Sequence, residues 1–433
     1  MKLSKKIMAL LLAVVLVFSF AACSAGSDEN SDASAGVGAA DIKIGVIEIG
    51  DDTETYTKAH ADGIRAAAEK LGIPAENISW KEKIPESEEC YTAAQELVAS
   101  GCQLVISNSY GHQDFIAEAA EDYPDVTFVA MTGDYAAISG LPNLYNAFTK
   151  IYQARYVSGI VAGMKLQELQ ETNQLGDNNF DENGNIKVGY VGAYPYAEVV
   201  SGYTAFYLGI KSIVSNVVMD VQYTNSWFDL EGEAAAAETL MARGCVIIGQ
   251  HADSTGAPTA VEDAYNEGTV AYSVGYNVDM TDVAPDVALT SSTNNWEVYY
   301  EELFSAVMNG TEIPQDWAKG YEADAVGITP LGSACADGTQ EAVDAAIENL
   351  KNGSLQVFDT SKFTVEGAQV TTAPIDLSYY DYSTGTASVV YQGEEKEAIV
   401  TENNITYFEE SVLRAAPYFQ LRIDGITELN ANS

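Results

Sequence analysis

Positive charge is scarce in this sequence. Its 433 residues include 21 lysines and arginines against 63 aspartates and glutamates, which gives a formal net charge of −42 at pH 7. A surface of that sign repels the phosphates of nucleic acids and the headgroups of anionic lipids. We therefore expect no nucleic-acid partner, and the charge favours neutral or cationic small molecules.

Long apolar runs are missing beyond the N-terminus, which excludes a protein with several membrane-spanning helices. Hydrophobic residues still make up 47% of the chain and charged residues 19%, a globular composition with ample material for a core. A length of 433 residues is typical of two or three domains.

Cysteine and histidine are also few, at five and three residues. Four of the cysteines lie beyond the N-terminal region and form no CxxC pair: Cys90, Cys102, Cys245 and Cys335. We interpret these four as buried thiols, with a disulfide as the alternative. The histidines show no HxH or HExxH spacing, so no metal site is expected.

The motifs of common enzyme classes are absent. No GxGxxG follows a predicted strand, and neither GxxxxGK[ST] nor GxSxG occurs. Cys245 and His251 are close enough in sequence to suggest a nucleophile pair, but Cys245 begins a buried strand and should point into the core. We expect no catalytic residues, no cofactor and no enzymatic activity.

The N-terminus predicts export. Lysines at positions 2, 5 and 6 precede an uncharged apolar stretch from 7 to 22, which is too short for a stable membrane-spanning helix. The sequence FAAC at 20–23 resembles the bacterial lipobox, in which the cysteine is acylated, although Phe20 replaces the usual aliphatic residue. Residues 1–22 are therefore predicted to be a lipoprotein signal peptide and Cys23 the lipid-anchored residue. A plain secretory signal cleaved nearby is the alternative.

Residues 23–41 are small, polar and acidic, which predicts a flexible tether between the lipid and the folded part. From residue 42 onward, short β-rich runs alternate with amphipathic helical patterns. The predicted strands are Ile42–Ile47, Gln103–Ser107, Val126–Ala130, Ile186–Val191, Val217–Tyr223, Cys245–Gly249, Val270–Val274 and Val287–Ser291. After the first strand, a helix is expected with Ala61, Ile64, Ala68 and Leu71 on one face, closed by Gly72 and Pro74. Further helices are expected around 88–100, 112–122, 152–168, 197–214, 231–243, 257–267 and 294–309. This alternation predicts parallel sheets built from βαβ units, in two lobes.

The domain boundaries follow from where the pattern changes. We predict a first α/β lobe over 42–150 and a second over 151–275. Residues 276–433 should form crossover segments and a C-terminal β-rich extension shared between the lobes, and the polar segment 378–410 within it has no assigned role. The turn-rich stretch around Asn179–Gly184 faintly resembles a calcium loop, but a solvated turn fits better, because the first position is not Asp and the twelfth is Tyr190.

Ligands of open parallel sheets bind beyond the carboxyl ends of the strands. The predicted loops at that edge hold two of the four tryptophans, Trp227 and Trp296, together with tyrosine, asparagine and aspartate residues. Aromatic faces with a few amide and carboxylate groups suit a small planar or ring-shaped ligand. As alternatives, the tryptophans could cover their own helices, and Asp229, Asp253 and Asp279 could be helix caps or turn residues.

Several sequence blocks resemble the basic membrane protein family of bacterial ABC-transporter substrate-binding lipoproteins. The more specific blocks are NSWFD at 225–229, GQHADS at 249–254 and LTSSTNNWEVYY at 289–300. Further matches are YTKAH at 56–60, SNSYG at 107–111, ARYVSGIVAGM at 154–164, IKVGYVGAYP at 186–195 and APYFQLRIDGI at 416–426. The resemblance covers roughly residues 42–375 and the last of these blocks, and it points to the branch of the family associated with purines.

This resemblance implies a type I periplasmic-binding-protein fold, in which two doubly wound parallel-sheet lobes are joined by crossover hinge segments and close on a ligand. By matching positions it assigns stacking to Trp227 and Trp296, and adds Tyr56 and Tyr110 as further aromatic candidates. The polar candidates are Asn108, His251, Asp253 and Asn277. Nucleoside receptors often carry Asp at the position of Asn277 and Lys near Asn294, so these departures favour a free base.

The sequence thus predicts a monomeric, extracytoplasmic solute-binding component of an ABC importer, anchored to the cell membrane through its lipid alone. It should capture a purine base or nucleoside and deliver it to an ABC permease. The alternatives are a receptor for a sugar or another small polar solute, and a ligand sensor with no role in transport.

Overall fold

The computed structural model describes residues 36–381 and 387–431. The predicted signal peptide, the predicted lipidation site Cys23 and the predicted tether up to residue 35 lie outside the described residues. The last part of the predicted tether is described. Val37 and Ala39 in it pack against buried hydrophobic residues of the first lobe. No helix in the described ranges is long and apolar enough to cross a membrane.

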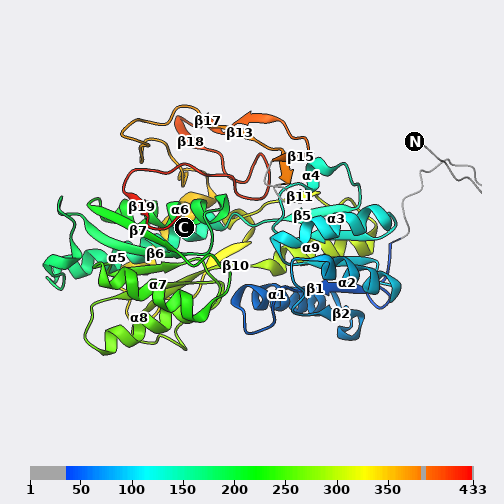
Figure 1. The fold of residues 1–433 in the computed structure, drawn as a ribbon, viewed down its shortest axis with the longest axis horizontal. Coiled ribbons are helices and arrows are strands. Elements are labelled where there is room, and N and C mark those ends of the chain that lie inside the picture. The colour runs from blue at the N-terminus through cyan, green and yellow to red at the C-terminus, as the bar shows by residue number, and fades with distance from the viewer. Residues whose placement is uncertain (1–35, 382–386, 432–433) are drawn as a thin grey trace, which may run out of the picture. The chain divides into compact units, whose positions relative to one another are not determined.

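The first lobe is built on a six-stranded sheet in the order β11-β5-β4-β3-β1-β2, with every neighbouring pair parallel (Figure 1). Its strands are β1 (Ile44–Ile47), β2 (Ile78–Lys81), β3 (Leu104–Ser107), β4 (Thr127–Ala130), β5 (Leu144–Ala147) and β11 (Asp316–Trp317). The helices are α1 (Thr55–Leu71), α2 (Glu88–Ala99), α3 (Gln113–Asp122), the short α4 (Ala136–Ser139) and α9 (Trp296–Asn309).

Alternate side chains of these strands enter two separate cores, because successive residues of a strand point to opposite faces. Ile44 and Val46 pack with α1 and α9, whereas Ile47 packs with α2 and α3. Helix α1 ends where the sequence predicts: Gly72 takes a left-handed conformation (φ 71°), and its N–H bonds to carbonyls of the last turn.

The second lobe is built on a seven-stranded sheet in the order β12-β10-β9-β8-β6-β7-β19. Its strands are β6 (Ile186–Gly192), β7 (Val217–Tyr223), β8 (Ile247–Gln250), β9 (Tyr272–Tyr276), β10 (Ala288–Asn294), β12 (Val326–Ile328) and β19 (Ile426–Glu428). All pairs are parallel except β12 with β10. The helices are α5 (Ile151–Glu171), α6 (Ala197–Ile213), α7 (Leu230–Ala242), α8 (Gly256–Asn266) and α10 (Thr339–Lys351). Figure 1 shows α6 on one side of this sheet and α7 and α8 on the other.

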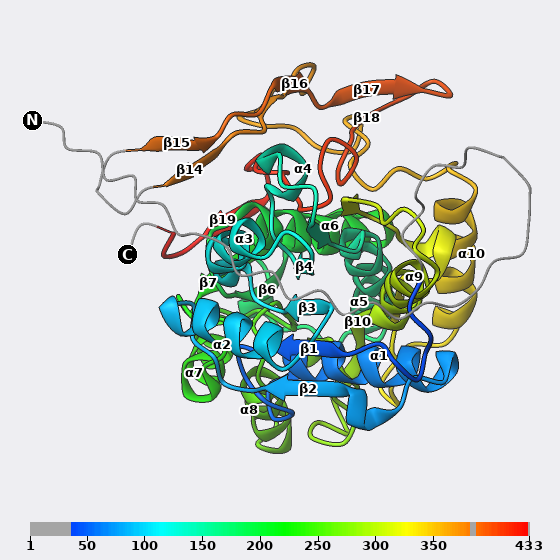
Figure 2. The ribbon, with the colours of Figure 1, turned by 90° about the vertical axis from the view of Figure 1, so that its right-hand side faces the viewer.

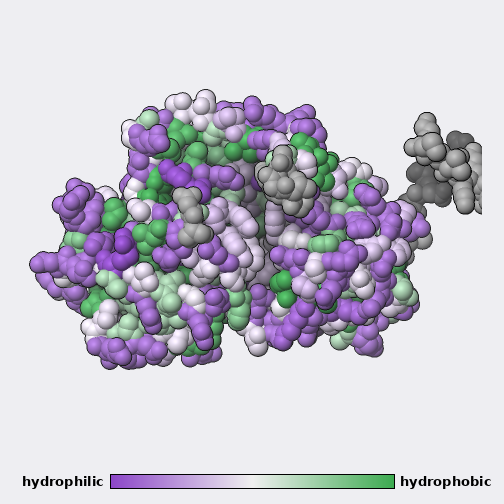
Figure 3. All heavy atoms as spheres, in the orientation of Figure 1, coloured by the Kyte–Doolittle hydropathy of each residue, from purple (hydrophilic) through white to green (hydrophobic). Residues whose placement is uncertain are grey.

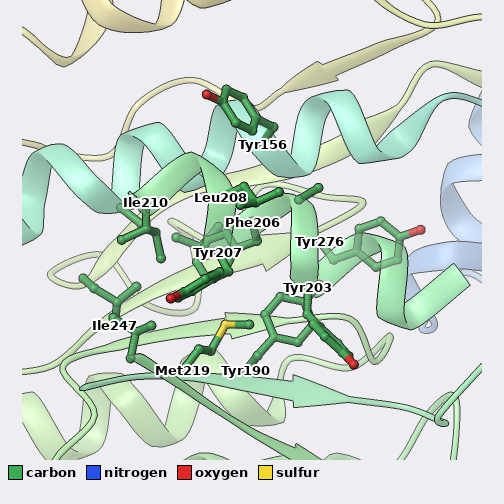
Figure 4. Close-up of a cluster of buried hydrophobic side chains, with 14 of the residues drawn as sticks. Tyr156, Tyr190, Tyr203, Phe206, Tyr207, Leu208, Ile210, Met219, Ile247 and Tyr276 are labelled. Atoms are coloured by element: carbon green, nitrogen blue, oxygen red, sulfur yellow. The ribbon is translucent and has the colours of Figure 1, made fainter. Parts of the chain in front are cut away.

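Helices α5 and α6 pack unusually closely in the core of this lobe. Tyr156 from α5 and Phe206 and Ile210 from α6 belong to the buried cluster drawn in Figure 4, with Met219 from β7 beneath them. Gly159 permits the close approach, because a Cβ at that position would lie 2.2 Å from the carbonyl oxygen of Phe206.

Both lobes have the doubly wound strand order in which the first strand lies between the second and the third. The order is β2-β1-β3-β4-β5 in one lobe and β7-β6-β8-β9-β10 in the other. The chain crosses between the lobes three times: from β5 to α5, from β10 to α9, and from β11 to β12. The predicted fold class, two doubly wound lobes joined by crossover segments, is confirmed.

The C-terminal extension (residues 354–431) consists of three small hairpin-like pairs followed by β19. The pairs are β13 (Pro374–Asp376) with β16 (Glu395–Glu397), β14 (Tyr379–Asp381) with β15 (Ser388–Tyr391), and β17 (Ile399–Glu402) with β18 (Ile405–Phe408). Figure 2 shows these strands running along one side of the molecule above the helices of both lobes. Phe358 and Phe419 join the core of the second lobe, whereas Tyr379 and Tyr391 pack against the first.

Three parallel strands of the first sheet were not predicted from the sequence: the two-residue β11, and β2 and β5. Strands β2 and β5 have only four residues each and begin next to a turn rich in proline or asparagine. Such short runs show neither a continuous apolar stretch nor a clear alternation. Their place in the sheet is decided by pairing with β1 and β4, which supply the neighbouring backbone partners.

Candidate ligand-binding site

A cavity of about 670 Å³ lies where the two lobes and the extension meet. Its walls come from loops at the carboxyl ends of both sheets, as expected for doubly wound sheets. Figure 3 shows a mostly hydrophilic surface that is hollowed where the two lobes adjoin. The volume falls within the range of about 300–1,000 Å³ typical of small-molecule sites.

Six of the predicted site residues line this cavity. They are Tyr56, Tyr110, Trp227, His251, Asp253 and Trp296. The other two, Asn108 and Asn277, lie behind the wall. The amide oxygen of Asn108 accepts a hydrogen bond from the backbone N–H of Ile49 (2.9 Å), and Asn277 donates to Asp253 (3.2 Å). These two asparagines therefore position the loops that carry other lining residues.

Trp296 forms an apolar face of the cavity at the crossover from β10 to α9. Its indole is only 2% exposed and stacks on the imidazole of His60, with ring centroids 4.3 Å apart and planes 20° from parallel. Tyr56 meets the same imidazole edge-on at 4.6 Å. Burial lowers the pKa of His60 to about 3, so this ring is neutral and acts as an aromatic support.

Trp227 sits in a more open environment on the second lobe. Its indole packs edge-on against Tyr194 at 5.1 Å and lies 6.1 Å from Tyr196. Tyr196 is half exposed and approaches Tyr110 of the first lobe at 6.5 Å. These rings form an aromatic rim around the cavity, with contributions from both lobes.

Asp253 is the buried acid of the site. Its backbone carbonyl accepts hydrogen bonds from the N–H and hydroxyl of Thr55, at 3.2 and 2.9 Å, and these bonds tie the two lobes together. Burial raises the pKa of the Asp253 carboxyl well above its ordinary value, and the nearby carboxyls of Glu54 and Glu233 raise it further. Burial also raises the pKa of Glu54, which faces the cavity from the first lobe. Asp253 and Glu54 thus place two desolvated carboxyl groups at the cavity, where a ligand can form hydrogen bonds with them.

His251 is held rigidly by polar partners. Its Nε2 lies 2.5 Å from the Glu198 carboxylate and its Nδ1 3.3 Å from the Tyr190 hydroxyl. Burial lowers the pKa of His251, against the opposing effect of Glu198. Nearby, the guanidinium of the buried Arg155 stacks over the ring of Tyr276 at 3.7 Å and donates to the carbonyl of Gln250. The second-lobe wall is therefore preorganised.

Two of the three loop aspartates are a helix cap and a turn residue, which are the alternatives to ligand binding. Asp229 caps helix α7 by accepting a hydrogen bond from the N–H of Gly232, and Asp279 accepts from Thr281 within a turn. In the stretch with a faint likeness to a calcium loop, the carboxylate of Asp181 accepts hydrogen bonds from Asn183 and Asn185. No group of three or more metal-ligating side chains occurs within residues 36–381 and 387–431.

Other lining residues were not predicted as site residues. From the lobes these are chiefly Glu54, Asp134, Glu198, Tyr276 and Asn294, and from the extension Asp376, Ser378, Tyr379, Arg414, Pro417 and Gln420. Glu54, Tyr276 and Asn294 follow predicted strands, so position alone could have found them. No signal in the sequence places the extension residues at the cavity, because contacts so distant along the chain leave no local pattern.

Comparison with known proteins agrees with this architecture. A family model described as Bmp, ABC transporter substrate-binding protein PnrA-like, matches residues 46–361. A purine-binding protein of Brucella abortus is 30% identical over 318 residues, which is 73% of this chain and 83% of that protein. A putative ABC transporter glucose-binding protein of Haloferax volcanii is 28% identical over 263 residues, 61% of each chain. The solved structure of an ABC transporter solute-binding protein from Aeropyrum pernix has a TM-score of 0.61 at 15% identity, over 73% of this chain and 93% of that one, and shows a shared fold.

Proposed function

Because the chain belongs to the Bmp family of PnrA-like ABC transporter substrate-binding proteins, we propose that it captures a purine base or nucleoside between its lobes and delivers it to an ABC permease. The family is one of solute-binding proteins rather than enzymes. The observation that carries the choice of ligand is the pairing of aromatic faces with the buried acid Asp253 in one cavity. The purine-binding relative supports the same choice.

Both the ring face and the polar edge of a purine have suitable partners in this cavity. The π-face of the heterocycle stacks on an indole, and Trp227 and Trp296 both line the wall. Ring N–H and amino groups donate hydrogen bonds to Asp253 or Glu54, which relieves the cost of burying those acids. Binding to both lobes at once stabilises contact between them, to which the hydrogen bond from Thr55 to Asp253 also contributes.

A sugar is the second candidate, since the glucose-binding relative from Haloferax volcanii matches 61% of the chain. Aromatic rings beside carboxylates also suit the apolar face and the hydroxyl groups of a pyranose. A purine is preferred because the purine-binding relative matches 73% of this chain and 83% of its own length, against 61% of each chain for the glucose-binding relative.

A thermal-shift panel on the purified protein tests this proposal. Purine bases, purine nucleosides, pyrimidines and sugars are compared at equal concentration. A ligand present at 100 times its dissociation constant adds about 2.7 kcal/mol to the unfolding free energy. We expect a purine to give the largest shift. A larger shift with glucose or another hexose would indicate that the ligand is a sugar and not a purine. A response to neither class would refute both candidate ligands.

We also propose that the protein works outside the cytoplasmic membrane as a lipid-anchored monomer. This rests on the lipobox-like FAAC sequence at 20–23 and on the family's association with ABC transporters. The acylated residue would be Cys23.

A further inference from the structure

A third wall of the cavity comes from the extension, after the end of the region matched by the family model at residue 361. Its lining residues include Tyr379, on β14, and Arg414. The cavity volume of about 670 Å³ leaves room for more than a single heterocycle. The third wall is therefore available to the rest of a ligand whose base lies against the lobes.

The third wall is anchored to both lobes. Phe358 of the extension stacks on Tyr152 of α5 in the second lobe, with ring centroids 5.4 Å apart, and Phe419 stacks on Phe358 at 4.3 Å. On the other side, Tyr379 packs on Tyr135 of the first lobe at 4.4 Å. The backbone N–H of Ala415 donates to the carboxylate of Asp316 at 2.8 Å. These contacts hold the neighbouring Arg414 in a defined position over the cavity.

Arg414 is the one lysine or arginine among the described residues that line the cavity. Its Nε donates to the carbonyl of Ala416 at 3.3 Å. Its Nη1 lies 3.6 Å from Oδ2 of Asp134, which is longer than a hydrogen bond. The guanidinium fork is therefore fixed in place yet keeps N–H donors for a ligand.

Asp134 complements these donors from the first lobe. Its Oδ2 accepts a hydrogen bond from the Tyr110 hydroxyl at 3.1 Å, while its Oδ1 is buried and has no hydrogen-bond partner among the described residues. A donor fork beside an acceptor matches a group that accepts and donates at once, which is the property of a hydroxyl. An anionic group would meet the carboxylates of Asp134 and Asp376 at this wall.

The asparagines near the crossover, Asn294 and Asn277, are less suited to bind the hydroxyl groups of a ligand. Asn294 donates to the side-chain oxygen of Asn277 at 3.0 Å and accepts a hydrogen bond from Thr149. Asn277 in turn donates to Asp253. Their hydrogen-bonding capacity is largely used within the protein, which leaves the third wall as the better place for hydroxyl groups.

We infer that Arg414 binds the sugar hydroxyls of a purine nucleoside, with Asp134 as its positioning residue, and that the extension thereby makes the protein select nucleosides over free bases. This inference rests on the proposed function and differs from the sequence-based preference for a free base.

Titration calorimetry with adenosine, adenine and 2′,3′-dideoxyadenosine tests the inference. Arg414→Ala should weaken adenosine binding about 10- to 100-fold, the usual range for a hydrogen bond to a charged group, and change adenine binding less than twofold. Wild-type protein should bind the dideoxy compound about as weakly as the variant binds adenosine. Lys396→Ala is the matched control, because it removes the same charge from an exposed site of the same extension and should change nothing.

The outcomes separate the inference from the proposed function. If wild-type protein binds neither adenine nor adenosine, the proposed function fails and the inference with it. If both bind but Arg414→Ala weakens them equally, or leaves adenosine unchanged, the inference alone is overturned. Should the alanine variant not fold, Arg414→Lys keeps the charge beside Asp134 and removes the fork. That variant must also weaken adenosine selectively, and unchanged adenosine affinity overturns the inference.

Discussion

At the scale of single residues, the two cavity tryptophans differ in burial. Trp296 is 2% exposed and belongs to the core of the first lobe, whereas Trp227 is partly exposed beside the tyrosines of the rim. One substitution should therefore report mainly on folding and the other mainly on ligand binding.

Trp296→Ala is expected to lower the unfolding free energy by about 3–5 kcal/mol, because it empties a buried site and removes the stacking partner of His60. Trp227→Ala should leave the melting temperature close to that of the wild type and weaken purine binding about 5- to 150-fold, from the loss of roughly 1–3 kcal/mol of stacking. Denaturation and calorimetry on the same variants check both expectations.

Trp80→Ala is the matched control, since Trp80 on β2 lies away from the cavity and packs under Arg65. It should leave the affinity unchanged. A Trp227→Ala variant with lower stability and wild-type affinity would make Trp227 a hydrophobic lid on its own helix.

Cys23 carries the prediction of membrane attachment. Cys23→Ser should move the protein from the membrane fraction into soluble or uncleaved material, because the acyl chains that hold it there are lost. One chain contributes only about 0.8 kcal/mol per buried methylene, so stable retention requires more than one. Fractionation followed by immunoblotting is the measurement, and a processed serine variant that stays on the membrane would contradict the lipobox.

At the scale of elements, the contact between α5 and α6 is a tight packing constraint. Gly159→Ala would place a methyl group 2.2 Å from the Phe206 carbonyl oxygen, and backbone cannot move aside as a flexible side chain can. We expect a loss of about 3 kcal/mol or more of stability. At Gly72 an added methyl meets no atom within 4 Å, so Gly72→Ala should cost only about 1–2 kcal/mol, from its left-handed conformation. Equal losses in urea denaturation would argue against the close approach.

At the scale of the whole molecule, buried acids make stability depend on pH. Burial raises the pKa of Glu48 and Glu410 to about 8 and that of Glu233 to about 7, against an ordinary value of 4.5. Between about pH 4.5 and pH 8, these carboxyl groups have lost their protons in the unfolded chain but still hold them in the folded chain. The unfolding free energy must therefore fall as the pH rises from about 4.5 to 8.

Glu410→Gln tests this dependence. The variant keeps an acceptor for the backbone N–H of Tyr418 and should reduce the fall in stability by up to about 4 kcal/mol, at 1.36 kcal/mol for each pKa unit. Urea denaturation at pH 5 and pH 8, at constant ionic strength, gives the difference. Glu395→Gln changes the same charge at an exposed position and should retain the wild-type slope. Matching slopes in the two variants would show that general charge repulsion, not burial, causes the effect.

The excess of negative charge also limits the ligand. Glu54, Asp134, Glu198 and Asp253 line the cavity, and Arg414 is the one lysine or arginine among its described lining residues. A nucleoside monophosphate adds nearly two negative charges, so adenosine should bind at least about 100-fold more tightly than AMP at moderate salt. Calorimetry at two salt concentrations checks this, and similar affinities for the two compounds would contradict the acidic character of the site.

The local sequence was enough for much of the fold and part of the site. The periodicity of Ala61, Ile64 and Ala68 and the stop at Gly72 determined helix α1, because both signals act within one or two turns. The rule that ligands bind beyond the carboxyl ends of parallel strands placed residues such as Tyr56, Trp227 and Asp253 at the carboxyl edges of the two sheets.

Only the tertiary structure decided which of the predicted site residues line the cavity and which support it from behind. Asn108 and Asn277 fall behind the cavity wall, and Trp296 doubles as a core residue, because loop packing sets which side of a loop faces the ligand. The meeting of Arg414 with Asp134 joins positions that are 280 residues apart in the sequence. Propensity and periodicity are short-range signals, whereas a cavity wall arises from pairing and packing between distant segments, so the third wall could come only from the folded chain.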